Sequence, residues 1–269
     1  MTFKQIFKFP EPLRRGIIKK RYQRFLSDIV LESGETVQAH VANSGSMRTC
    51  WQENCPVIVS DFSNQEKRKL KYTLQAVEMP DGWVGINTSN PNQAVKSVLA
   101  QGLIKSLKGY DFLLPEVKIS KNSRIDLMLW TEELSEQARS FHPGKRTPQK
   151  LTPHTGDGNL NKELCFVEIK NVTLLENDGL ISFPDAITTR GQKHLLELID
   201  LKKQGFRAII LFFVGRNSAR CMTTAKDIDP KYDRFLKEAI YEHGVEALAI
   251  KAITREDGLY FDSEIEIRL

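Results

Sequence analysis

The sequence predicts an α/β protein with a small all-β domain over residues 1–88 and a mixed α/β domain over residues 89–269. Two observations support this division. The first part contains short alternating segments separated by turn residues, which is typical of a small sandwich or barrel. The second part alternates apolar strands with amphipathic helices, which is typical of a sheet with covered faces.

The individual elements follow from this patterning. In the first domain, strands are expected at residues 16–22, 25–31, 36–41, 56–60, 69–77 and 83–87. The composition changes at residues 88–92, where turn and helix-start residues gather. In the second domain, strands are expected at 112–119, 124–130, 164–172, 207–214 and 246–253, and helices at 93–105, 191–203 and 232–241. Residues 131–162 hold three prolines and three glycines without apolar periodicity, so we expect a mobile surface insertion there.

Length and composition describe an ordinary globular chain. Of its 269 residues, 41% are hydrophobic and 27% are charged, so it can bury a core. The longest apolar run, Ala208–Val214, has the length of a strand, whereas roughly 20 residues are needed to span a bilayer. The N-terminus lacks the apolar core of a secretory signal, so we expect a cytoplasmic protein without a membrane partner. The four cysteines, Cys50, Cys55, Cys165 and Cys221, are scattered and form no disulfide framework or zinc motif.

Positive charge is concentrated in the first 24 residues. They contain eight basic residues and one acid, a net +7, although the whole chain carries only +5. Basic side chains that neutralise phosphates release counterions, so this segment suits a nucleic-acid partner. The residues expected to contact phosphate are Arg14, Arg15, Lys19, Lys20, Arg21 and Arg24. The alternative is a solvated surface strand whose apolar residues pack inward.

Two predicted strands carry the residue types of a metal-dependent phosphodiesterase. Asp126 lies in the strand at 124–130, on the face opposite its apolar neighbours, and Glu168 and Lys170 share a face of the strand at 164–172. Acids in such strands are unfavourable unless charge or hydrogen bonds compensate them. We therefore predict a catalytic site of Asp126, Glu168 and Lys170, in which the carboxylates hold Mg²⁺ or Mn²⁺. Lys170 would orient or deprotonate the attacking water and stabilise the transition state, while the metal lowers the pKa of that water.

A polar helix start and one more acid extend the predicted site. Arg190, Gln192 and His194 lead into the helix at 191–203, where amides and the helix dipole favour anions. We expect these three side chains to hold the scissile phosphate. Glu116 lies ten residues before Asp126 on an adjacent strand, and it is either a third metal ligand or a surface acid.

The quoted motifs resemble known proteins. Asp126 with Glu168-Ile-Lys170 resembles the PD-(D/E)xK nuclease superfamily, and the whole chain resembles the sugar fermentation stimulation protein A family of bacteria and archaea. The segments that carry the second resemblance are residues 21–28, 43–47, 68–73, 123–126, 167–173, 183–188 and 190–194. The resemblance implies an OB-like barrel, then a restriction-endonuclease-like domain, and DNA binding linked to regulation of sugar utilisation genes. The insertion at 131–162 is longer than the turn expected of that family.

Two functions remain open from the sequence. The chain is either a metal-dependent nuclease that binds DNA or a non-catalytic DNA-binding regulator of sugar (maltose) utilisation genes on a nuclease scaffold. An enzyme acting on a small phosphorylated sugar is disfavoured, because no Gly-rich phosphate loop or dinucleotide fingerprint is present. The oligomeric state stays open, and a homodimer is one candidate.

Overall fold

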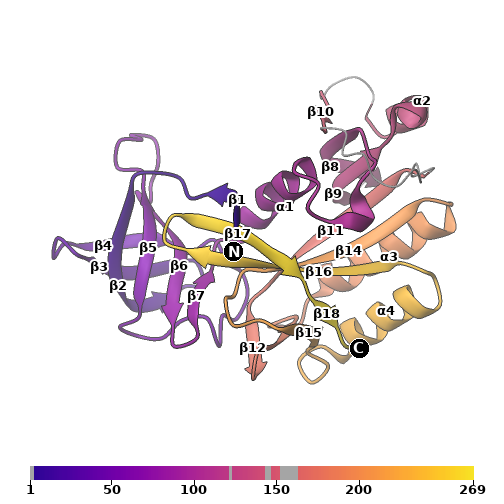
Figure 1. Cartoon of the computed structure of the whole chain (residues 1–269). Coiled ribbons are helices and arrows are strands. Elements are labelled where there is room, and N and C mark those ends of the chain that lie inside the picture. Colours follow the sequence, from indigo (N-terminus) through magenta and orange to yellow (C-terminus); the bar gives the residue numbers. More distant parts are fainter. Residues whose placement is uncertain (1–2, 121–122, 143–146, 152–162) are drawn as a thin grey trace.

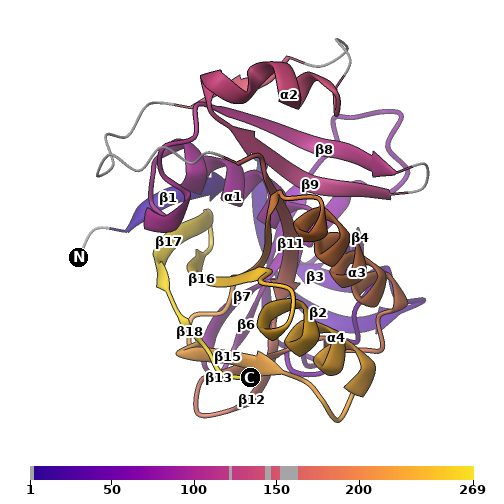
Figure 2. The ribbon, with the colours of Figure 1, turned by 90° about the vertical axis from the view of Figure 1, so that its right-hand side faces the viewer.

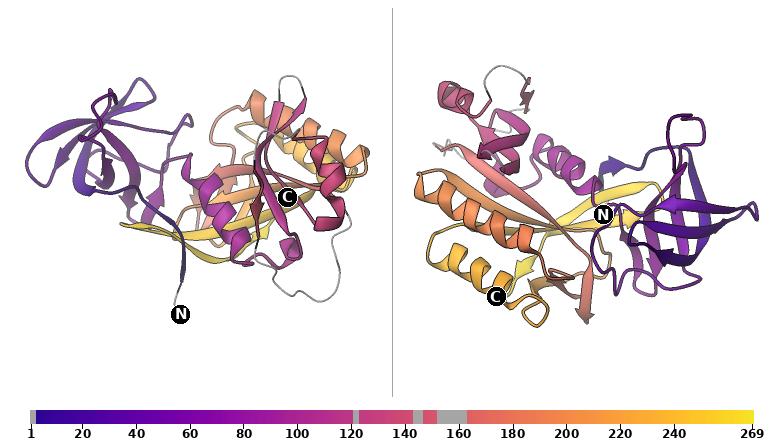
Figure 3. Two further views of the ribbon diagram at one scale, coloured as in Figure 1. Left: turned by 90° about the horizontal axis from the view of Figure 1, so that it is seen from above. Right: turned by 180° about the vertical axis from the view of Figure 1, so that it is seen from behind.

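A β-barrel and a larger α/β domain lie side by side in the computed structural model, which describes residues 3–120, 123–142, 147–151 and 163–269 (Figure 1). The barrel lies at one end, and a long hairpin of the α/β domain reaches towards it (Figure 3). In the described part of the chain, no helix combines the length and the apolar character needed to cross a membrane.

The barrel is built from a sheet in the order β4-β3-β2-β5-β6-β7. Its strands are β2 (Leu13–Tyr22), β3 (Leu26–Leu31), β4 (Thr36–His40), β5 (Pro56–Asp61), β6 (Tyr72–Met79) and β7 (Gly82–Gly85). Strands β2 to β6 close on themselves because β4 pairs with β6, where Ala39 lies opposite Tyr72. Alternate side chains, such as Ile18, Ile29 and Val57, fill a core that water does not reach.

The α/β domain has an eight-stranded sheet in the order β1-β17-β16-β14-β11-β9-β8-β10. These strands are β1 (Lys4–Lys8), β8 (Phe112–Ser120), β9 (Ser123–Trp130), β10 (Gln149–Lys150), β11 (Cys165–Val172), β14 (Arg207–Val214), β16 (Glu246–Arg255) and β17 (Gly258–Glu264). Strands β11, β14 and β16 run parallel at its centre, and the pairs towards both edges are antiparallel. Parallel strands are buried on both faces, which explains the uninterrupted apolar sequence of β14.

Helices cover both faces of this sheet (Figure 2). The helical segments are α1 (Asn90–Ala100), the 3₁₀ turns η1 (Lys105–Leu107) and η2 (Glu132–Leu134), α2 (Ser135–Arg139), α3 (Thr189–Lys203) and α4 (Pro230–Tyr241). Ile210 and Phe212 of β14 share a core cluster with α3 and α4, whereas Ile209 and Leu211 share another with α1. Alternate side chains of β14 therefore point to opposite faces of the sheet and belong to two separate hydrophobic cores.

A second sheet follows the end of β11, in the order β12-β13-β15-β18. Its strands are β12 (Leu174–Asn177), β13 (Leu180–Phe183), β15 (Cys221–Thr224) and β18 (Glu266–Ile267). All four are short, and the sequence pattern did not predict them. This sheet carries the chain from β11 to the start of α3.

The N-terminal boundary of the barrel differs from the prediction. Strand β1 belongs to the large sheet, where Lys4 lies opposite Phe261 of β17. Ile6 and Phe9 are buried in the same core cluster as α1. The assignment of residues 1–88 to one domain is wrong for this first strand, because its apolar side chains complete the core of the α/β domain.

The predicted insertion at 131–162 is also partly ordered. Residues 132–139 are helical, and β10 pairs with β8. Leu134, Ala138 and Phe141 pack on the core, and the ring centroid of Phe141 lies 5.0 Å from that of Phe166. The sequence reading overlooked this apolar stripe at helical spacing. Residues 143–146 and 152–162 lie outside the described part, so the expectation of mobility stays untested there.

One buried arginine ties the two domains together. Arg216 follows β14 and is only 2% exposed, and its Nε and Nη2 donate to Asp81 of the barrel at 2.7 and 2.8 Å. Its Nη1 donates to the carbonyl oxygens of Thr49 and Thr173, one on each side of the boundary. A buried guanidinium with every donor group engaged fixes the relative position of the domains.

We expect Arg216→Ala to lower the free energy of unfolding by about 3 kcal/mol, because it leaves Asp81 and two carbonyl groups without their donor. Urea denaturation followed by circular dichroism measures this change. Arg234→Ala, which removes an exposed arginine of α4, should change it by less than about 0.5 kcal/mol. Equal midpoints for the two variants would contradict the role assigned to Arg216.

Candidate metal-dependent phosphodiesterase site

Asp126 occupies a fork between two strands. Strand β9 pairs with β11 up to Leu127, which lies opposite Val167, and the two strands separate beyond that point. Asp126 comes next on β9, and its Oδ2 accepts a hydrogen bond from the backbone N–H of Ile169 at 2.8 Å. Its Oδ1 accepts from Asn92 Nδ2 at 2.9 Å, at the start of α1. At the fork, the Asp126 carboxylate therefore accepts a backbone hydrogen bond from β11 in place of a carbonyl group of β9.

Glu168 lies beside this fork and is almost fully buried. Its side chain is 3% exposed, and its Oε1 contacts Lys170 Nζ at 2.7 Å and His194 Nδ1 of α3. Its Oε2 is buried and has no hydrogen-bond partner among the described residues. Burial alone would raise the pKa of Glu168, but the charge of Lys170 and the contact with His194 outweigh burial and hold the pKa below its usual value.

Burial and the neighbouring charge act together on Asp126. Burial is the larger cause and the negative charge of Glu168 the second, and they raise the pKa of Asp126 to about 6. The N–H of Ile169, the Asn92 amide and Lys170 reduce this rise without cancelling it. Two like charges in one buried site are unfavourable, and a cation between them would relieve the repulsion.

The residues fit a hard divalent cation held by two carboxylates. The unpartnered Glu168 Oε2 offers a free oxygen ligand, and Mg²⁺ commonly keeps several waters while binding one or two protein carboxylates. Within the described ranges, no three His, Cys, Asp or Glu side chains gather closely enough to hold a metal by themselves. Asp126 and Glu168 are the two acids at the fork, and their role as metal ligands stays a prediction.

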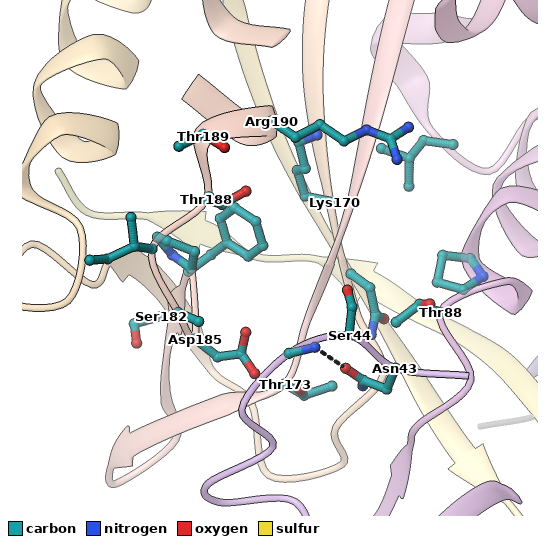
Figure 4. Close-up of a pocket in the computed structure, with 18 of the residues that line it drawn as sticks. Asn43, Ser44, Thr88, Lys170, Thr173, Ser182, Asp185, Thr188, Thr189 and Arg190 are labelled. Atoms are coloured by element: carbon teal, nitrogen blue, oxygen red, sulfur yellow. Dashed lines mark hydrogen bonds between the residues drawn. The ribbon is translucent and has the colours of Figure 1, made fainter. Parts of the chain in front are cut away.

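A cleft reaches Lys170, the ion-pair partner of Glu168 (Figure 4). It encloses about 440 Å³ between the two domains. The barrel lines one wall with residues that include Arg24, Asn43 and Ser44, and the α/β domain lines the other with residues that include Lys170 and Arg190. Lys170 has a side chain only 10% exposed, so the candidate site is recessed.

Matches to known proteins cover both domains. Residues 89–258 match the model of the sugar fermentation stimulation protein RE domain, and residues 20–86 match that of the SfsA N-terminal OB domain. The chain belongs to the SfsA family. The predicted resemblance to this family is therefore confirmed, as is the order of an N-terminal OB barrel and a mixed α/β domain.

Relatives of similar length support this assignment. Sugar fermentation stimulation protein homologs from Geotalea uraniireducens and Rhodospirillum rubrum are 40% and 42% identical to the chain. The first match covers 97% of this chain and 99% of the relative, and the second covers 90% and 91%. The solved structure of Pyrococcus furiosus SfsA in complex with Ca²⁺ superposes with a TM-score of 0.79 at 22% identity. That likeness covers 98% of this chain and 99% of the archaeal chain.

The predicted phosphate donors of α3 have different positions in this SfsA-family structure. Arg190 is exposed and lines the cleft, and its Nε lies 3.4 Å from His194 Nε2. His194 is buried against Glu168 and Lys170, so it holds the carboxylate. Gln192 is buried too, and its Nε2 donates to both carboxylate oxygens of Asp229, at 2.9 and 3.0 Å. Only Arg190 of the three is placed to receive a phosphate, because its neighbours are committed to internal carboxylates.

Glu116 is not gathered into the site. Its φ of +56° interrupts the regular alternation of β8, and its side chain is exposed. Val117 and Pro115 lie opposite Ile125 and Leu127, so Glu116 is a neighbour of Asp126 along the sheet. Glu116 was predicted as a third metal ligand because it precedes Asp126 on an adjacent strand. Among the described residues, however, no group of three acidic, His or Cys side chains is close enough to hold a metal.

The basic segment is also divided by the fold. Arg14 and Arg15 form ion pairs with Asp61 and Glu256, Lys19 donates to Asn54 at 2.7 Å, and Lys20 lies over the ring of Tyr22. The half-buried Arg21 donates to the carbonyl oxygens of Asn43, Gly45 and Ser46, and burial lowers its pKa. Among the six, Arg24 alone lines the cleft. Their contact with phosphate stays a prediction.

Two contributors to the site were missed or underrated in the sequence. Asn92 holds Asp126, yet it looked like a residue of the helix start only. Asp185 accepts hydrogen bonds from Met47 N at 3.0 Å and Ser46 Oγ at 3.3 Å, which fixes the barrel loop at the cleft. A side chain on Gly45 would collide with the Asp185 carboxylate. The polar turn Asn43–Met47 was visible in the sequence, but the sequence did not indicate that Asp185 would be its hydrogen-bond partner.

The raised pKa of Asp126 predicts a stability that depends on pH. Because the pKa in the folded protein, about 6, exceeds the unfolded value of 3.8, ionisation destabilises the metal-free protein as pH rises through this window. Asp126→Asn removes this penalty, so the metal-free variant should be more stable than the wild type by about 3 kcal/mol at pH 7.5.

The difference should nearly vanish at about pH 3, below the unfolded pKa of 3.8, where Asp126 is mostly protonated in both states. Urea denaturation in EDTA at the two pH values measures it. Asp200→Asn, the same change at an exposed position of α3, serves as the control. A stability gain of equal size at both pH values would contradict the assignment.

Proposed function

We propose that the chain is a Mg²⁺- or Mn²⁺-dependent phosphodiesterase that acts on DNA, with Asp126 and Glu168 as metal ligands and Lys170 as the catalytic cation. The observation that carries this proposal is a pair of buried carboxylates beside Lys170, a lysine that lines the cleft. One of the two, Glu168, has an oxygen without a hydrogen-bond partner among the described residues. When bound, the metal supplies a water of lowered pKa and charge neutralisation at the phosphoryl oxygen.

The surrounding residues prepare this chemistry. Ile169 N–H and Asn92 orient Asp126, while His194 and Lys170 hold Glu168 Oε1 and leave Oε2 available. Lys170 Nζ lies at the cleft, where it can orient the attacking water and stabilise the charge that develops on the phosphate. Arg190, on the cleft wall, supplies a second cation for the substrate phosphate.

The comparisons support a divalent cation and a polyanionic substrate. Pyrococcus furiosus SfsA was solved with Ca²⁺, which prefers oxygen ligands as Mg²⁺ does. The OB barrel belongs to a fold that commonly binds oligonucleotides. Both features agree with the positively charged cleft walls of this chain.

We expect the purified protein to cleave DNA oligonucleotides in Mg²⁺ or Mn²⁺ and to lose this activity in EDTA. Asp126→Asn, Glu168→Gln and Lys170→Ala should each lower the cleavage rate at least about 100-fold, because each removes charge stabilisation in the site. Gel analysis of end-labelled products measures the rate.

Asp200→Asn should cleave like the wild type, since Asp200 is exposed on α3 outside the cleft. Cleavage that survives both Asp126→Asn and Glu168→Gln would come from a contaminant or another site and would refute the proposal.

A second candidate function is DNA binding without cleavage, as a regulator of sugar utilisation genes. It is favoured by the exposed lysines of β2, Lys19 and Lys20, which lie outside the cleft. Here, replacing Lys19 and Lys20 by Gln should lower the slope of log affinity against log salt by about 1 to 2 for duplex DNA. Replacing Lys231 and Arg234, two exposed cations of α4, by Gln is the charge-matched control. Gel-shift titrations at several salt concentrations give the slopes. Unchanged slopes would remove this candidate.

A further inference from the structure

We infer that the cleft accepts a single-stranded segment of nucleic acid, and that Arg24 of the barrel binds the strand's phosphate opposite Lys170 and Arg190. This inference rests on the proposed function and names the substrate class of the same site. It combines the depth of the site, the fixed position of the barrel wall and the distribution of unpaired charge.

The site lies too deep for an undistorted duplex. Lys170 lines the cleft between the two domains with a side chain only 10% exposed, and Glu168, which is 2% exposed, contacts its Nζ. Duplex DNA is a stiff rod with a persistence length of about 150 base pairs, so it presents its phosphates on a convex surface. A single strand bends freely, and enzymes whose reactive groups are recessed commonly act on single-stranded or extruded nucleotides.

The barrel wall is fixed in place beside the cleft. Asp185 accepts from Met47 N and Ser46 Oγ, and Arg21 donates to three carbonyl oxygens of the loop 43–46. The buried pair of Arg216 and Asp81 adds a second attachment between the domains. Moving the barrel away from the α/β domain would break the contacts of Asp185 and of Arg216 together, while the bonds of Arg21 hold the loop within the barrel.

Unpaired positive charge faces the cleft from both walls. Arg24 lies in the turn between β2 and β3, where its φ of +65° and that of Gln23 at +47° make a tight reversal. It is exposed, and no carboxylate of the described residues pairs with it. On the opposite wall, Arg190 likewise has no carboxylate partner in the part of the chain that the structure describes. Asp185, the acid between them, is engaged by the loop.

The residue after Arg24 suits bases rather than phosphates. Phe25 is 43% exposed, so its ring is accessible to a ligand. Aromatic side chains beside a positively charged groove let successive bases stack without sequence preference. Arg24, which lines the cleft, would contact a phosphate, and the adjacent exposed Phe25 would stack on a base of the same strand.

The test compares binding of a fluorescein-labelled 20-nucleotide single strand with its blunt duplex, by anisotropy in Ca²⁺, using full-length Asp126→Asn protein at several salt concentrations. The single strand should bind at least about 10-fold more tightly. Arg24→Ala should weaken its binding about 10-fold and lower the salt slope by about 0.7, the value for one phosphate contact on a single strand. Arg234→Ala removes an equivalent exposed arginine from α4 and should leave both unchanged.

Equal or tighter binding of the duplex would overturn the inference, as would an Arg24→Ala protein that binds like Arg234→Ala. Circular dichroism of the variants excludes loss of folding as the cause. A wild-type protein that cleaves single strand and duplex at equal rates would refute the substrate class while leaving the phosphodiesterase in place. Retained single-strand preference without any cleavage in Mn²⁺ would remove the phosphodiesterase and support the binding cleft.

Discussion

The burial of two carboxylates in the fork between β9 and β11 is the constraint on which the site depends. A buried acid is stable only if donors or cations compensate it. Asp126 receives the N–H of Ile169 and the amide of Asn92, and Glu168 receives Lys170 and His194. The Asn92 side-chain amide comes from α1 and the His194 imidazole from α3. These two helices cover opposite faces of the sheet. The packing of both helices is therefore a condition for keeping the acids charged together.

The barrel completes the site by its position and by its own side chains. Its loop at 43–47 is held by Asp185 of the α/β domain, and Arg216 ties the end of β14 to Asp81. These bonds convert an open sheet edge into a cleft with a second wall. A site built across a domain boundary in this way depends on contacts remote from the reacting atoms, since a displaced barrel would move Arg24 without touching Asp126.

The period-two pattern of the strand at 164–172 predicted that Glu168 and Lys170 share a face, and the structure places Lys170 Nζ 2.7 Å from Glu168 Oε1. Their catalytic roles, and that of Asp126, stay a prediction. What failed required knowledge of partners far away in the sequence. Gln192 looked like a phosphate donor until the fold placed Asp229 beside it, and Glu116 looked like a ligand until its backbone left the strand conformation. The short sheet after β11 was missed because four strands of two to four residues carry too little periodicity to detect.

Charge shows most clearly why composition alone misleads. The first 24 residues carry +7 in the sequence, yet Arg14 and Arg15 are paired with acids from distant segments and Arg21 is used to hold a loop. The cations that line the cleft come from different elements: Arg24 and Arg190 have no carboxylate partner among the described residues, whereas Lys170 is paired with Glu168. A salt bridge between exposed partners neutralises charge without creating a recognition surface. The position of cations that have no acidic partner therefore predicts a polyanion-binding surface better than the net charge of the segment does.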